Sequence, residues 1–278
     1  MSQVGQAWRV LAFVWSHPAN RRHRLRSVAH AVRFQVRGRL GRPTMTTVGR
    51  RGRMRAWLHD TAAARALYAN PPDWNEMRAW SRWLRPGDLF VDVGSNVGGY
   101  ALWVAEAGAE VIAVEPDRDA ATKLRANVAL NEYPIVVREC ALAAEPGRMW
   151  LTRDLGATNH LLSAPSAGAA QVEVDTLDNL LGDRYAAGVK IDVEGVERLV
   201  LEGAVRALAE HRIGVLQLEW NAMSQRVLGE TRSPVADLLA RHGYRLARPD
   251  RQGELRPAVA SAASDRDMFA IPHRAGRL

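Results

Sequence analysis

Residues 92–100 read Asp-Val-Gly-Ser-Asn-Val-Gly-Gly-Tyr and join a short apolar stretch to a segment with helical spacing. The stretch at 89–93 is apolar except for Asp92, and the helical spacing runs over 97–107. Glycine suits such a turn because it accepts positive φ and lets the backbone approach a ligand closely. In open α/β sheets the ligand lies beyond the carboxyl ends of the strands. We therefore expect this turn to form one wall of a ligand site.

Apolar strand patterns and helical spacing alternate through most of the chain. This alternation predicts an α/β protein with a doubly wound, mostly parallel, seven-stranded Rossmann-like sheet. The last two strands predict an antiparallel hairpin at one edge, and further hairpins are predicted for 45–48 with 54–58 and for 149–152 with 171–174. The predicted strands are 89–93, 110–114, 135–142, 189–193, 215–219, 244–247 and 268–271, and the predicted helices are 74–84, 97–107, 119–131, 196–210 and 235–242.

The glycine turn lacks the G-x-G-x-x-G spacing of a dinucleotide-binding loop and reads D-x-G-x-N-x-G instead. Asp92 would repel a pyrophosphate placed beside it, so the sequence disfavours NAD. The same carboxylate suits a ligand that carries an ammonium group. These features favour S-adenosylmethionine (SAM), with its methionine part held by the turn and with Gly94 and Gly98 giving access to the backbone.

Two more strand ends carry candidates for the rest of this cofactor. Glu115 and Pro116 end the second strand about 20 residues after Gly94, where such sheets present a carboxylate to ribose hydroxyls. The third strand ends near Cys140 and Ala141, whose backbone would flank the adenine. The cofactor-binding residues predicted from the sequence are Asp92, Gly94, Ser95, Asn96, Gly98, Tyr100, Glu115, Pro116, Cys140, Ala141 and Asp192.

Carboxylates also follow the fourth and fifth strands. Residues 190–197 read Lys-Ile-Asp-Val-Glu-Gly-Val-Glu, and an aspartate in an apolar strand is costly unless it is paired or used. Asp192 and Glu194 share one face of the strand because side chains alternate along it. Glu219 ends the next strand and points to the same rim. We expect these three acids to lie close to the reacting group.

The motifs together resemble the FkbM family of SAM-dependent methyltransferases. They are the glycine turn at 92–98, Glu-Pro at 115–116, the acid-rich segment at 190–197, and the segments 174–180 and 268–272. The resemblance covers about residues 74 to 272. One departure is Ser95, where alanine is commoner in the family, and this exchange of one small residue for another changes little.

The resemblance implies O-methylation of hydroxyls on sugars or natural products, so the expected partner is a small-molecule hydroxyl acceptor. Transfer requires the acceptor oxygen in line with the methyl–sulfur bond, and a base that removes the hydroxyl proton. The candidate catalytic residues are Asp192, Glu194 and His160. Alternatively, Asp192, Glu194 and Glu219 bind a divalent cation that makes the hydroxyl more acidic.

The first 57 residues form a basic arm. They contain no acidic residue, whereas acidic residues outnumber basic ones from Asp60 onward. Such an arm predicts contact with an anionic surface or partner. A general bias toward arginine, with 36 arginines and two lysines in the chain, is the alternative explanation. The arm contains thirteen arginines, at positions 9, 21, 22, 24, 26, 33, 37, 39, 42, 50, 51, 53 and 55.

Residues 4–16 are apolar at helical spacing, through Val4, Trp8, Leu11, Ala12 and Trp15. This run is shorter than the roughly 20 residues of a transmembrane helix, and its arginines follow it, unlike those of a signal peptide. The pattern favours a helix packed on the core or on a second subunit over an interfacial helix. The single cysteine favours a reducing compartment, so the sequence predicts a cytoplasmic protein. Its oligomeric state is either monomer or homo-oligomer. The predicted division is an arm at 1–57, a methyltransferase domain at 58–273 and a tail at 274–278.

Two alternative functions remain open. Asn-Pro-Pro-Asp at 70–73 imitates the N-P-P-aromatic motif of nucleic-acid methyltransferases, and the basic arm would bind nucleic acid. However, Asp73 stands where an aromatic side chain should stack on the base, and the preceding 61–69 has helical rather than strand spacing. The second alternative is a non-catalytic SAM-binding accessory protein. The complete set of acids at the strand ends argues against it.

Overall fold

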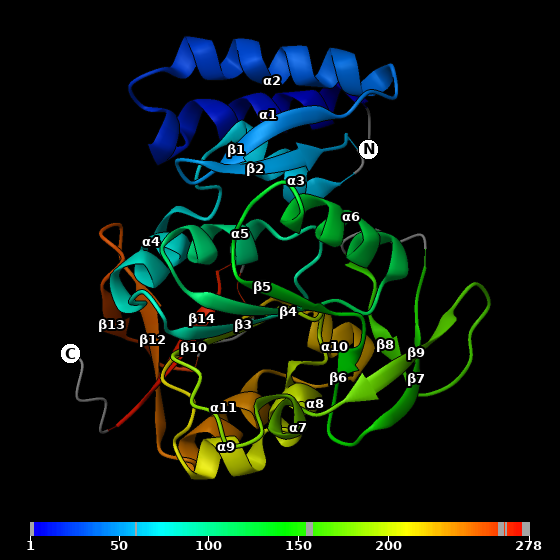
Figure 1. Ribbon diagram of the computed structural model, residues 1–278, viewed down its shortest axis with the longest axis vertical. Coiled ribbons are helices and arrows are strands. Elements are labelled where there is room, and N and C mark those ends of the chain that lie inside the picture. Colours follow the sequence, from blue (N-terminus) through cyan, green and yellow to red (C-terminus); the bar gives the residue numbers. More distant parts are fainter. Residues whose placement is uncertain (1–2, 59, 154–157, 261–263, 265, 274–278) are drawn as a thin grey trace.

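The computed structural model describes residues 3–58, 60–153, 158–260, 264 and 266–273. A central sheet lies between two groups of helices, and a layer formed by the N-terminal segment covers one group from outside (Figure 1). Eight strands make up the central sheet in the order β13-β12-β14-β11-β10-β3-β4-β5. They are β3 (Leu89–Val93), β4 (Glu110–Val114), β5 (Ile135–Arg138), β10 (Gly188–Ile191), β11 (Leu216–Leu218), β12 (Tyr244–Pro249), β13 (Leu255–Pro257) and β14 (Met268–Pro272).

The predicted doubly wound sheet is confirmed, with one change at its end. Strands β5, β4, β3, β10 and β11 are parallel, and β14 runs antiparallel to both β11 and β12. The antiparallel strand therefore lies inside the sheet, and an eighth strand, β13, forms the edge. All five residues of β14 are buried, whereas β13 has exposed residues and ends in Pro257. A fully buried strand needs neighbours on both sides, and proline is tolerated at an edge.

Helices cover both faces of the sheet. In Figure 1, α4, α5 and α6 lie above it, and α8, α9 and α11 lie below. The predicted helix 196–210 is interrupted at Gly203, where a Cβ would lie 2.0 Å from the carbonyl oxygen of Ala143. The helices are α3 (Thr61–Tyr68), α4 (Trp74–Trp83), α5 (Gly99–Glu106), α6 (Arg118–Val128), α7 (Leu177–Leu181), α8 (Glu197–Glu202), α9 (Val205–Ala209), α10 (Met223–Val227) and α11 (Ser233–Arg241).

The irregular stretch after β5 folds into a second, four-stranded sheet with the order β6-β9-β7-β8. The single strand predicted for 135–142 is wrong, because the chain leaves the central sheet after Arg138 and β6 joins the second sheet. The predicted pairing of 149–152 with 171–174 is confirmed by β7 and β9. The strands are β6 (Ala141–Leu142), β7 (Gly147–Leu151), β8 (Leu161–Leu162) and β9 (Ala170–Asp175).

The N-terminal segment contains α1 (Gln3–Ser16), a short 3-10 helix (Pro18–Asn20), α2 (Arg24–Arg39) and the predicted hairpin β1 (Thr44–Val48) and β2 (Gly52–Ala56). It packs on the rest of the protein through a buried apolar cluster that includes Val14, Phe34, Met54 and Leu102 of α5. Helix α1 thus packs on the core as expected. Its predicted apolar stripe, however, faces outward at Trp8, Ala12 and Trp15. The side chain of Val4 and the tail at 274–278 lie outside the described residues, and the division at residue 57 stays a prediction.

No helix among the described residues is both long and apolar enough to cross a membrane.

Candidate functional site

A cavity of about 430 Å³ opens at the carboxyl ends of β3, β4, β10 and β11. All the candidate residues predicted from the sequence line it except Gly98. Other lining residues come from the N-terminal half of the chain, among them Val48 of β1, Arg65 and Ala66 of α3, and the segment at Pro72 and Asp73. Among the described lining residues, six carry carboxylates and two carry cations, which are Asp73, Asp92, Glu115, Asp192, Glu194 and Glu219 against Arg65 and Lys190.

The glycine turn is shaped by three residues with left-handed backbone. Gly94 has φ 78°, Asn96 φ 51° and Gly98 φ 94°. A Cβ on Gly94 would lie 1.8 Å from the carbonyl oxygen of Asp192, so the tips of β3 and β10 touch at this point. Gly98 instead caps the first turn of α5, where a Cβ would meet Leu124 at 2.6 Å. Gly98 does not line the cavity, and its contact with the cofactor stays a prediction.

Asp92 is buried at the base of the turn with a lysine that the sequence analysis did not select. Its side chain is 1% exposed, and Ser95 Oγ donates a hydrogen bond of 2.7 Å to Asp92 Oδ2. Lys190 Nζ lies 3.9 Å from Asp92 Oδ1 and 2.7 Å from Asp192 Oδ2. Burial raises the pKa of Asp92, and the Lys190 cation opposes this shift. Burial lowers the pKa of Lys190, but attraction to Asp192 and Asp92 outweighs it and leaves that pKa above its ordinary value.

Glu115 joins the glycine turn to the end of β4. Its carboxylate accepts hydrogen bonds from the backbone N–H groups of Asn96, at 2.8 Å, and Asp117, at 2.9 Å. Burial raises the pKa of Glu115 to about 7, against the effect of these two donors. Glu115 is 7% exposed and borders the cavity. This is the position expected of a carboxylate that binds ribose hydroxyls.

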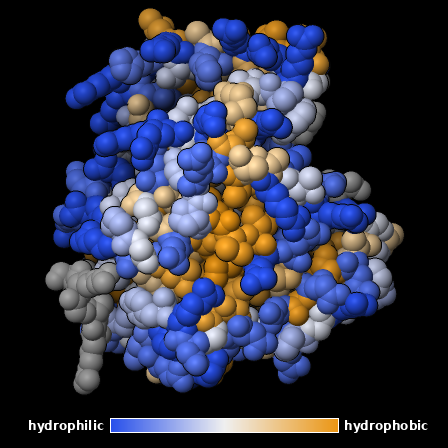
Figure 2. Space-filling view, in the orientation of Figure 1, coloured by the Kyte–Doolittle hydropathy of each residue, from blue (hydrophilic) through white to orange (hydrophobic). Residues whose placement is uncertain are grey.

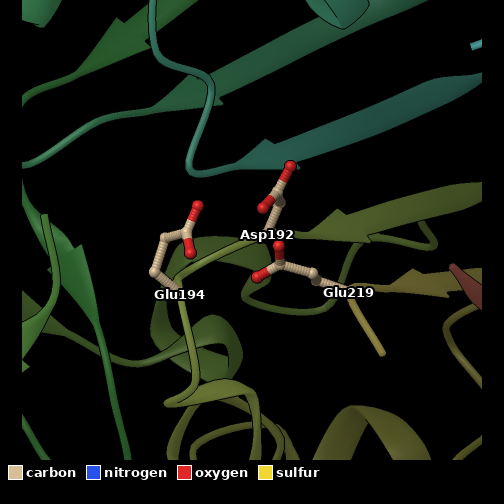
Figure 3. Close-up of side chains that lie close together, drawn as sticks. All are labelled: Asp192, Glu194 and Glu219. Atoms are coloured by element: carbon tan, nitrogen blue, oxygen red, sulfur yellow. The ribbon is translucent and has the colours of Figure 1, made fainter. Parts of the chain in front are cut away.

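The three acids predicted to meet at the rim do so. One carboxylate oxygen from each of Asp192, Glu194 and Glu219 lies within 4.8 Å of the others, and the three side chains converge from two neighbouring strand ends (Figure 3). Burial, followed by repulsion from Asp192 and Glu197, raises the pKa of Glu194 to about 7. Burial and repulsion from Asp192 also raise the pKa of Glu219, whose Oε2 is buried without a hydrogen-bond partner.

Glu194 has a left-handed backbone, with φ 56°. This conformation is uncommon for a residue with a long side chain and is found most often at functional sites. Gly195 follows with φ 104°, and a Cβ there would lie 2.7 Å from the backbone of Met223. The backbone at Met223 therefore holds the sharp turn after β10, and this turn presents Glu194 to the cavity.

A buried ion pair that the sequence analysis missed supports this turn. Glu197 is fully buried, and its Oε2 lies 2.5 Å from Nη1 of Arg232. Glu197 Oε1 accepts a hydrogen bond of 3.0 Å from the backbone N–H of Gly195. Arg232 Nε donates a 2.9 Å bond to the carbonyl of Asn221, whose side chain in turn donates to Glu219. The pair thus connects the loops that carry Glu194 and Glu219.

A second missed network lies beneath the cavity. Gln217, in the apolar strand β11, donates hydrogen bonds to Tyr100 Oη at 3.1 Å and to Asp267 Oδ2 at 2.6 Å, and it accepts one from the Trp80 indole. Burial and repulsion from Asp192 raise the pKa of Asp267 to about 7. A glutamine between two leucines was the available signal, because a buried amide requires partners.

The remaining candidates have less specific surroundings. His160 lies on the cavity wall between β7 and β8, with its Nδ1 at 3.1 Å from the carbonyl of Thr158. Burial raises the pKa of the Cys140 thiol to about 11, so this thiol is protonated at neutral pH. The Asn-Pro-Pro-Asp segment reaches the cavity at Pro72 and Asp73, but it follows helix α3 rather than a strand.

The sheet order, the glycine turn and the acids at successive strand ends define a Rossmann-like methyltransferase domain. A model of the methyltransferase FkbM domain matches residues 92–246, which is more than half of the chain. The chain belongs to this family, as its motifs predicted.

The 31-O-demethyl-FK506 methyltransferase FkbM of Streptomyces tacrolimicus is 30% identical over 157 residues, covering 43% of this chain and 60% of the relative. The chain thus spans less than two thirds of that protein's length. Solved structures with lower similarity include a TehB-like SAM-dependent methyltransferase from Corynebacterium glutamicum, with 16% identity, TM-score 0.42, and coverage of 71% of this chain and 86% of that one. Magnesium protoporphyrin IX methyltransferase from Synechocystis, solved with bound SAM, has 14% identity, TM-score 0.40, and coverage of 67% and 71%.

Proposed function

We propose that this protein transfers a methyl group from SAM to a hydroxyl oxygen of a small molecule such as a sugar or another natural product. The observation that carries the proposal is the meeting of Asp192, Glu194 and Glu219 at the rim of the cavity that the glycine turn and Glu115 border. The similarity to a 31-O-demethyl-FK506 methyltransferase supports a hydroxyl of a natural product as the acceptor.

The charge of the cavity supports SAM as the cofactor. SAM carries a positively charged sulfonium and an ammonium group, and its one carboxylate leaves it cationic. Six of the described lining side chains are carboxylates, and of the two cations Lys190 is already paired with Asp192 and Asp92. The surplus of acidic over basic side chains therefore favours a cationic ligand over a dinucleotide. A Cβ on Gly94 would lie 1.8 Å from the carbonyl oxygen of Asp192, so only glycine fits at this point of the wall.

Bound SAM supplies a methyl group on a sulfur that leaves as a neutral thioether. The protein then has to hold the acceptor oxygen in line and take up the hydroxyl proton. Glu194 is the best placed base among the predicted candidates, because its pKa of about 7 leaves a substantial fraction ionised at neutral pH. Asp192 is held by the Lys190 cation. We infer that Asp192 orients Lys190, and that His160, on the cavity wall, borders the acceptor.

The same three carboxylates are a second candidate, as a site for a divalent cation. Hard cations such as Mg²⁺ prefer carboxylate oxygens, and Glu219 Oε2 lacks a partner among the described residues. A cation held there would make a neighbouring hydroxyl more acidic. Loss of activity on chelation, with recovery on addition of Mg²⁺, would assign this role in place of a metal-free base.

We expect Glu115→Gln to weaken SAM binding by roughly 10- to 100-fold, because hydrogen bonds to a charged group contribute about 1.5–3 kcal/mol. Titration calorimetry of SAM into the purified protein measures this effect. Glu110→Gln, at the exposed start of the same strand β4, is the matched control and should bind as the wild type. A folded wild-type protein that binds no SAM would refute the proposed function.

We expect methyl transfer to increase as the pH rises through about 7, because only the ionised form of Glu194 can accept the hydroxyl proton. At saturating SAM, Glu194→Gln should lower the rate by roughly 10²- to 10⁴-fold and remove this rise. The measurement is methyl transfer to a panel of hydroxylated sugars and polyketides, with the exposed Glu145→Gln as control. Transfer to RNA or DNA alone would favour the nucleic-acid alternative, and SAM binding without any transfer would favour the accessory protein.

A further inference from the structure

The two N-terminal helices expose apolar side chains on their outer faces. On α2, Leu25, Val32 and Val36 are 76%, 49% and 56% exposed, and their spacing places them on one side of the helix. On α1, Trp8 and Trp15 are 68% and 47% exposed. We call these five side chains the docking face. A surface helix ordinarily turns such residues inward, so this arrangement is the reverse of the usual one.

Arginines border the docking face. Arg26, Arg33 and Arg37 are exposed and follow one another along α2 beside the apolar row. The guanidinium of Arg24 lies 5.4 Å from the centre of the Trp15 ring, which brings the outer sides of α1 and α2 together. Figure 2 shows hydrophobic side chains between hydrophilic ones at the upper edge of the molecule, where Figure 1 places α2. Residues 1–58 contain no acidic side chain that could neutralise the arginines.

A basic groove of about 670 Å³ runs between α2 and the end of α3. His23, Arg26, His30 and Arg33 line it from α2 and the residue before it, and Tyr68 and Asn70 lie opposite. None of the described lining residues is a carboxylate. The groove therefore suits a phosphate group, and it lies directly beside the apolar row of α2.

We propose that α1 and α2 dock the protein on an anionic membrane surface, with the docking face among the lipid headgroups and the arginines on lipid phosphates. Amphipathic helices with this composition bind the interface between headgroups and acyl chains. Nucleic acid would engage the arginines but leave the apolar row in water, because such binding rests on phosphate contacts. A second copy of the chain is disfavoured because a symmetric contact would bring two arginine-rich faces together without carboxylates.

Docking would bring the candidate site close to the lipid. Helix α2 packs on β1 and α3, and these elements supply Val48, Arg65 and Ala66 to the wall of the cavity. One structural layer therefore separates the docking face from the cavity. The inference does not depend on the proposed activity, since it rests on the outer surface of the N-terminal helices.

The test is flotation of the full-length protein with vesicles, without SAM. We expect binding to vesicles of phosphatidylglycerol and phosphatidylcholine in equal parts, and binding at least about tenfold weaker to phosphatidylcholine alone. A triple variant, Arg26→Gln, Arg33→Gln and Arg37→Gln, should lower binding about tenfold or more, because each arginine near an anionic bilayer contributes separately. The matched control neutralises three exposed arginines elsewhere, with Arg118→Gln, Arg241→Gln and Arg251→Gln, and should bind as the wild type.

A second triple variant, Leu25→Ser, Val32→Ser and Val36→Ser, keeps every charge and separates insertion from simple attraction. We expect it to lower vesicle binding several-fold, and circular dichroism should remain unchanged because all three side chains are exposed. Vesicle binding that is equal for this variant and the wild type would overturn the proposal. RNA binding without vesicle binding would also overturn it. A wild-type dimer that binds no vesicles, and that the serine variant dissociates, would overturn it as well.

Discussion

Arg232→Leu is expected to lower the free energy of unfolding by about 3–5 kcal/mol, because it leaves a buried carboxylate without its counter-ion. Arg232 and Glu197 are 3% and 0% exposed, and their side chains lie 2.5 Å apart. The substitution also removes the bonds from the guanidinium to Asn221. Chemical denaturation followed by circular dichroism measures the change.

Two further variants show whether the loss comes from the unpaired charge. The double variant Glu197→Leu with Arg232→Leu removes both charges, so it should be more stable than Arg232→Leu alone. Arg148→Ala breaks an exposed ion pair with Glu173 and should cost about 1 kcal/mol or less. If Arg232→Leu is no more destabilising than Arg148→Ala, the buried pair does not hold the two loops as we infer.

Residue spacing predicted most of the central sheet because buried parallel strands are short apolar runs and the helices between them have one apolar face. The sequence predicts no range for helix α2, because several of its apolar residues do not face the core. Its apolar row at Leu25, Val32 and Val36 lies between arginines and faces outward. A sequence pattern shows that a helix has two unlike faces but does not show which one packs. The same limit explains why the stripe of α1 was predicted to pack inward.

The candidate site was predictable to the extent that it follows strand ends. Asp92 lies near the end of its strand, and Glu115, Asp192 and Glu219 each directly follow one; parallel strands bring their ends to one edge. The supporting residues were missed because their partners are remote in sequence, as Arg232 is from Glu197 and Asp267 is from Gln217. Each of these contacts depends on a loop whose path the spacing of residues does not determine.

Gly94→Ala should disrupt both the fold and the cofactor site. The φ of 78° costs a residue with a side chain about 1–2 kcal/mol. In addition, a Cβ would lie 1.8 Å from the carbonyl oxygen of Asp192, and neither backbone can move without separating β3 from β10. We expect a loss of roughly 2–5 kcal/mol in the free energy of unfolding, from the conformation and the overpacking together. Denaturation measures this loss, and calorimetry should show SAM binding weakened by at least about tenfold.

Two glycines separate the causes of this effect. Gly41 has φ 67° and no atom within 4 Å of its Cβ position, so Gly41→Ala reports the cost of the backbone conformation alone. Gly99 is the first residue of α5, with negative φ and open space, so Gly99→Ala should leave stability unchanged or slightly raise it, as alanine favours helices. Because only Gly94 combines positive φ with contact against the Asp192 backbone, its variant should lose more than Gly41→Ala. Equal losses at Gly94 and Gly41 would show that the tips of β3 and β10 are not in contact, and the proposed wall of the SAM site would then be wrong.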